Sequence, residues 1–106
     1  MDLIKPFQFS QQIHGVQVKP LVESGKEVRI LYNGPLSSSG AENVELHYGF
    51  GYSGNWDNVH DLGMERSQEG WEVSVSMIEN QLNFCFRDSA FKWDNNNGLN
   101  WIYRIS

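Results

Sequence analysis

Two tryptophans stand in polar segments where no apolar repeat accounts for them. Trp56 lies in the Gly/Ser/Asn-rich segment 51–58, and Trp93 directly precedes the run Asp-Asn-Asn-Asn-Gly at 94–98. An exposed indole is a flat apolar surface on which one face of a pyranose ring can pack, and asparagine amides donate and accept the hydrogen bonds that sugar hydroxyls need. The pattern predicts a sugar-binding surface; the alternative is that both indoles tuck under their loops as small satellite cores.

A histidine is expected on the same surface. The segment 44–50 alternates as a strand does and would turn one set of side chains to the core: Val44, Leu46, Tyr48 and Phe50. Glu45 and His47 then point the other way. His47 therefore stands on the outer face, close to the loop that carries Trp56.

The acidic side chains favour no catalytic role. Those in or near loops are Asp57, Asp61, Asp88 and Asp94. A pair of carboxylates could hydrolyse a glycoside, but aspartates in Asn/Gly-rich turns usually shape the turn itself. The sequence has no nucleophile motif, phosphate-binding glycine loop or paired-cysteine zinc pattern. His14, His47 and His60 lack metal-ligand spacing. We expect no enzyme activity, no metal and no cofactor.

The remaining residues with reactive or large aromatic side chains are expected in the hydrophobic core. Cys85 is the only cysteine, lies in a strand-like run and has no basic neighbour that would activate it, so a buried inert thiol is expected. Trp71 and Trp101 each begin a clean alternating run, which predicts that both indoles are buried.

The length and net charge of the chain limit the kinds of ligand that it can be expected to bind. The chain has 106 residues, which is one domain. Its formal net charge is −5, and its eight Lys and Arg form no cluster. Nucleic acid and anionic membrane are therefore poor partners, whereas a neutral ligand fits.

The elements that must position these residues are strands. Apolar residues recur with period two in runs that start at Val16, Val28, Val44, Trp71, Leu82 and Trp101. Turn-forming residues separate the runs, and no window shows a sustained helical stripe. The sequence predicts an all-β sandwich or barrel, with a domain over 13–106 after a flexible lead or edge segment over 1–12.

Two segments carry a family resemblance. The run FCFRD at 84–88, followed after four residues by WDNNNG at 93–98, resembles the C-terminal signature of starch-binding carbohydrate-binding modules of families 25 and 53. The run LHYGF at 46–50 followed by Trp56, and the strand that ends in Tyr32-Asn33, are similar to the same pattern. The resemblance covers roughly Glu27 to the C-terminus and implies an immunoglobulin-like β-sandwich of two antiparallel sheets.

The resemblance also implies a function. It implies non-catalytic binding of α-1,4-linked glucan (starch, glycogen or maltooligosaccharides) by stacking on Trp56 and Trp93, with hydrogen bonds from His47 and from Asn95, Asn96 or Asn97. The partner would be the glucan, with a glucan-active enzyme acting in trans. The rival interpretation is a β-sandwich that uses the same exposed aromatics to contact a protein.

The expected location depends on where the chain starts. Residues 1–7 contain no apolar stretch of signal-peptide length. If the chain is complete, we expect a cytoplasmic protein that acts on glycogen or a related storage glucan.

Overall fold

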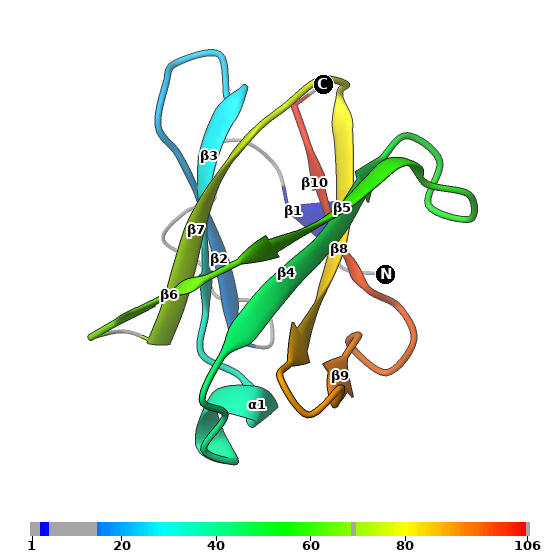
Figure 1. Ribbon diagram of the computed structural model, residues 1–106. Coiled ribbons are helices and arrows are strands. Elements are labelled where there is room, and N and C mark those ends of the chain that lie inside the picture. Colours follow the sequence, from blue (N-terminus) through cyan, green and yellow to red (C-terminus); the bar gives the residue numbers. More distant parts are fainter. Residues whose placement is uncertain (1–2, 5–14, 69, 106) are drawn as a thin grey trace.

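The computed structural model describes residues 3–4, 15–68 and 70–105, and the regular secondary structure of these residues is almost entirely strands (Figure 1). In chain order the elements are β1 (Leu3–Ile4), β2 (Val16–Pro20), β3 (Glu27–Tyr32), α1 (Pro35–Ser38), β4 (Val44–Phe50), β5 (Asp57–Gly63), β6 (Glu65–Ser67), β7 (Gly70–Ser76), β8 (Gln81–Asp88), β9 (Trp93–Asp94) and β10 (Trp101–Arg104). Within the predicted lead segment 1–12, β1 pairs with β10, and the other residues lie outside the described part of the chain.

The strands form two sheets that face each other (Figure 1). The larger sheet has the order β1-β10-β8-β4-β5, with β9 also paired to β8, and the smaller has the order β2-β3-β7-β6. All pairings are antiparallel except the short one between β1 and β10. The prediction of an all-β sandwich of two antiparallel sheets is confirmed.

An aromatic cluster fills the space between the sheets. The largest fully buried side chains are Trp101, Tyr32, Tyr103, Phe50, Phe84 and Phe86. Phe86 is the centre of this cluster, because its ring centroid lies 4.1 Å from that of Tyr32 on the opposite sheet and 5.3 Å from that of Trp101. The predicted burial of Trp71, Trp101 and Cys85 is confirmed.

The long strand β8 organises the outer face of the larger sheet. One edge of β8 pairs with β4 over residues 82–88. The other edge is shared, since β10 pairs with residues 81–84 and β9 with residues 86–87. The segment between β9 and β10 therefore leaves the sheet beside Cys85.

One strand and a short helix depart from the sequence-based expectation. The segment 51–58 was expected to be all loop, but Asp57 and Asn58 already belong to β5. β5 is an edge strand whose side chains are mostly exposed, so it lacks the apolar alternation by which a half-buried strand is recognised. The helix α1 has four residues, too few to show a periodic stripe. No helix among the described residues is long and apolar enough to cross a membrane.

The fold predicts a large stability cost for emptying the core at Phe86. Phe86→Ala should lower the free energy of unfolding by about 3–5 kcal/mol, because it leaves a cavity among three aromatic rings. Urea denaturation would measure this loss. The control is Leu99→Ala, since Leu99 is 47% exposed and its truncation should change stability by no more than about 0.5 kcal/mol. Equal effects of the two substitutions would contradict this description of the core.

Candidate functional site

His47 lies at the middle of β4, on the outer face of the larger sheet. The register of β4 places it opposite Asp61 on β5 and opposite Cys85 on β8. His47 Nδ1 is 2.7 Å from Asp61 Oδ1, so the carboxylate fixes the orientation of the imidazole ring. His60, by contrast, contacts the ring of Tyr48.

Two indole rings flank this histidine. The ring centroid of Trp56 lies 5.7 Å from that of His47 at an interplanar angle of 35°, and that of Trp93 lies 5.3 Å away at 87°. The two indole planes are therefore steeply inclined to each other. Trp93 is 48% exposed, whereas Trp56 is half-buried and packs partly against the core. The structure thus brings together three side chains that are distant in the sequence.

A shallow hollow of about 450 Å³ lies between these rings. Its lining residues are His47, Gly54, Asn55, Trp56, Val59, Cys85, Trp93, Asn95 and Asn100. The apolar lining comes from the indoles and Val59, and the amide groups come from Asn55 in the β4–β5 loop and from Asn95 and Asn100 in the β9–β10 loop.

Because Gly49 has no side chain, Trp56 can approach β4 closely. A Cβ atom at this position would lie 2.8 Å from the Cβ of Trp56, closer than such atoms approach in proteins. The register of β4 with β5 also shifts just beyond Tyr48, where Asn58 has a left-handed φ of 51°. The indole Nε1 donates to the carbonyl oxygen of Ser53 at 2.9 Å, which holds the ring in its loop.

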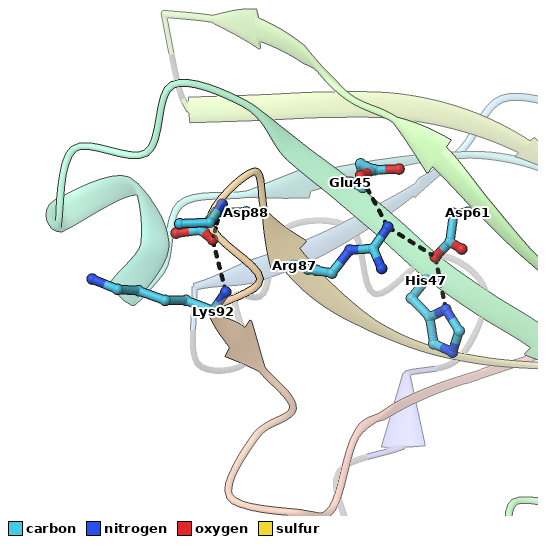
Figure 2. A network of polar contacts seen from close by, with 7 residues as sticks. Glu45, His47, Asp61, Arg87, Asp88 and Lys92 are labelled. Carbon is cyan, nitrogen blue, oxygen red and sulfur yellow. Dashed lines mark hydrogen bonds and ion pairs between the residues drawn. The ribbon is translucent and has the colours of Figure 1, made fainter.

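Arg87 holds Trp93 from the neighbouring strand. The register pairs Trp93 with Arg87, whose guanidinium carbon lies 5.3 Å from the centroid of the indole ring. Arg87 Nη2 donates to Glu45 Oε1 at 3.0 Å and lies 4.0 Å from Asp61 Oδ1. Figure 2 shows that these contacts join Glu45, Arg87, Asp61 and His47 in one network.

A buried tyrosine anchors the loop that follows Trp93. The hydroxyl of Tyr32 donates to Asp94 Oδ2 at 2.6 Å and accepts from the backbone N–H of Leu36 at 3.1 Å. Burial, together with the hydrogen bond to Asp94, raises the pKa of Tyr32, so the hydroxyl keeps its proton as the donor. Asp94 Oδ1 accepts from the backbone N–H of Asn96 at 3.3 Å. The core thereby sets the position of the turn.

The three predicted asparagines have different places. Asn95 lines the hollow, and its Oδ1 accepts from the backbone N–H of Gly98 at 2.9 Å. Asn96 is buried and donates from Nδ2 to the carbonyl oxygen of Asn100. Asn96 and Asn97 both have a φ of 57°, a left-handed conformation that asparagine tolerates better than most residues. They shape the turn and are not among the residues that line the hollow.

Some lining residues were not singled out in the sequence. Asn55 could have been found, because it directly precedes Trp56. Val59 and Asn100 carried no signal, since their position depends on the β5 register and on the return of the chain to β10.

The electrostatics of the hollow do not favour nucleophilic chemistry. Burial, reinforced by the negative charges of Asp61 and Asp94, raises the pKa of the Cys85 thiol to about 12. The group therefore stays a neutral thiol near pH 7, and a thiol is a poor nucleophile. Glu45 and Asp61 are engaged with Arg87 and His47. No group of three or more metal-ligating side chains occurs among the described residues. The arrangement suits the binding of a neutral ring that carries hydroxyl groups.

A larger hollow of about 620 Å³ lies on the other side of the loop 51–56 and includes Tyr52, Gln81 and Arg104. Tyr52 is the one aromatic residue among its described lining residues. Converging aromatic rings therefore distinguish the smaller hollow, which we take as the candidate site.

Sequence comparison gives two matches. Residues 28–84, from β3 to within β8, match the starch/carbohydrate-binding module (family 53). An alpha-amylase of Clostridium acetobutylicum is 34% identical over 91 residues, which are 83% of this chain and 11% of that protein. The chain thus spans about a tenth of the length of the curated relative it matches. No solved structure matches the chain significantly.

The anchoring of the Trp93 loop can be tested at Tyr32. Tyr32→Phe keeps the ring in the core but removes the donor to Asp94 and the acceptor for Leu36. We expect a loss of about 1–3 kcal/mol in the free energy of unfolding. We also expect larger chemical-shift changes in amides of residues 93–100 than in those of β2 or β7, measured by NMR. Changes spread evenly over both sheets would contradict a local anchoring role.

Proposed function

The chain belongs to family 53 of the starch/carbohydrate-binding modules, and from this premise we propose that it binds α-1,4-linked glucan in the hollow between Trp56, His47 and Trp93. This family is non-catalytic, so the chain is a binding module and not an enzyme.

The observation that carries the proposal is the inclination of two indole planes about one histidine. A pyranose ring presents one apolar face, which packs on an aromatic plane. In an α-1,4-linked chain successive rings turn relative to each other, so two neighbouring sugars stack best on planes that are inclined. A flat chain, such as a β-1,4-linked glucan, would match two coplanar platforms better.

Hydrogen bonds at the rim support the same ligand. Asp61 engages His47 at Nδ1, which leaves Nε2 to contact a sugar hydroxyl. Asn95 has its Oδ1 bound within the turn, so its Nδ2 is the group that would donate to a hydroxyl. The stacking and rim groups come from strands and hydrogen-bonded turns, which limits the entropy lost on binding. For a shallow site of this kind we expect a Kd in the micromolar to millimolar range, about −8 to −4 kcal/mol.

The test is calorimetric titration with maltoheptaose, with cellohexaose as the control sugar. The protein should release heat on titration with maltoheptaose but not with cellohexaose. Trp93→Ala should abolish most of the maltoheptaose binding because it removes an exposed platform. The control variant is Leu99→Ala, which removes an exposed apolar side chain that does not line the hollow. Unchanged affinity in Trp93→Ala would overturn the proposed site. Absence of binding to either sugar by the unmodified protein would overturn the function and favour the protein-contact interpretation.

We further propose that the module holds glucan for a glucan-active enzyme that it meets in trans. The support for an enzyme partner is that a protein named alpha-amylase contains a segment 34% identical to this chain; in that protein the segment is part of the same polypeptide, and that the enzyme is a separate protein here is part of the proposal. Addition of the module should change the rate at which an α-amylase degrades insoluble starch granules. Trp93→Ala should remove that change, and an identical effect of both proteins would contradict the role.

A further inference from the structure

We propose that Phe91 forms a third aromatic platform of the glucan-binding surface, beyond Trp93, and that it contacts the longer glucan chains only. This inference rests on the proposed function, since it assigns a further contact to the same ligand. Phe91 lies in the loop between β8 and β9 and is not among the residues that line the hollow.

The backbone of Phe91 adopts a conformation that is strained for a residue with a bulky side chain. Its φ of 61° lies in the left-handed region, where a glycine fits without strain and a bulky residue is an outlier. Phe91 is also 70% exposed, so burial of its ring offsets little of that strain. Residues held in such conformations cluster at binding and active sites. An aromatic ring at this position therefore calls for an explanation other than stability.

The loop holds the ring in a defined place. Asp88 Oδ1 accepts from the backbone N–H of Ala90 at 2.9 Å and of Lys92 at 2.8 Å, and the carbonyl oxygen of Asp88 accepts from the N–H of Phe91 at 3.1 Å. Figure 2 shows the contact between Asp88 and Lys92 next to the network around Arg87. Because hydrogen bonds already order this loop, Phe91 can contact a ligand without a further loss of loop entropy.

One guanidinium group joins Phe91 to the binding surface. The Arg87 guanidinium carbon lies 5.1 Å from the ring centroid of Phe91 and 5.3 Å from that of Trp93. Its position is fixed by the hydrogen bond to Glu45, and the side chain of Arg87 is only 18% exposed. Each ring thus has one side on the same cation and keeps exposed surface for a ligand. The aromatic surface runs from Trp56 past His47 and Trp93 to Phe91.

The occupant that we assign is a glucan chain that extends past Trp93. The ring is continuous with the proposed site through Arg87, whose charge is already balanced by Glu45. The extension therefore offers little attraction to an anionic partner, and its aromatic ring suits the apolar face of another sugar. A short oligosaccharide that fills the hollow would not reach it.

Three substitutions at Phe91 test the inference by titration with maltotriose and maltoheptaose. Phe91→Gly should weaken maltoheptaose binding about two- to tenfold, leave maltotriose binding unchanged, and raise the urea midpoint of unfolding because strain is relieved. Phe91→Tyr should bind as the unmodified protein does. Phe91→Leu, which keeps an apolar cover over Arg87 but has no ring, should bind as weakly as Phe91→Gly.

The outcomes separate this inference from the proposed function. Unmodified protein that binds neither sugar overturns the proposed function and with it the inference. Unmodified protein that binds maltoheptaose, while Phe91→Gly binds it equally well, overturns the inference alone. Maltoheptaose affinity retained in Phe91→Leu also overturns it, because the side chain would then only cover Arg87. Leu99→Ala serves as the control for loss of an exposed apolar side chain.

Discussion

The geometry of the proposed binding surface depends on one hydrogen bond that crosses the sandwich. Tyr32 belongs to the smaller sheet, its ring lies 4.1 Å from Phe86 in the core, and its hydroxyl donates to Asp94 on the larger sheet. Because Asp94 directly follows Trp93 and caps the next turn, the packing of the core determines where the exposed indole stands. A buried core residue thus sets the position of the indole that we propose as a ligand platform.

The two faces of β8 link stability to binding in the same way. Phe84 and Phe86 point into the core, whereas Cys85 and Arg87 belong to the outer face that carries the site. Arg87 connects the acidic side chains of the outer face to the aromatic rings around it. The residues of the proposed site belong to strands and hydrogen-bonded turns, so we expect binding strength to depend mainly on the number of sugar rings that stack on an aromatic side chain.

Much of the architecture can be predicted from the sequence. Period-two alternation predicted the half-buried strands, the burial of Trp71 and Trp101, and a sandwich or a barrel, and the family resemblance selected the sandwich of two antiparallel sheets that the structure has. Alternation succeeds there because a strand with one side on a core must repeat apolar residues at every second position. The same rule placed His47 on the outer face, whereas the polar surroundings of Trp93 left both an exposed platform and a small satellite core open, and the structure shows the indole 48% exposed. The run WDNNNG, read as a family resemblance, pointed to glucan.

Which residues come into contact could not be predicted from local sequence patterns. The strand β5 was not predicted, because the side chains of an exposed edge strand face no core and therefore show no apolar repeat. The contact between Asp61 on β5 and His47 could not be predicted for the same reason. The separate places of Asn95 and Asn96 follow from left-handed backbone angles and from the Tyr32–Asp94 bond, which joins residues 62 positions apart. The local sequence determines which side of a strand a residue faces. Contacts between distant segments depend on strand register and on where the loops bring the chain back to the sheet, and both are determined by the fold as a whole.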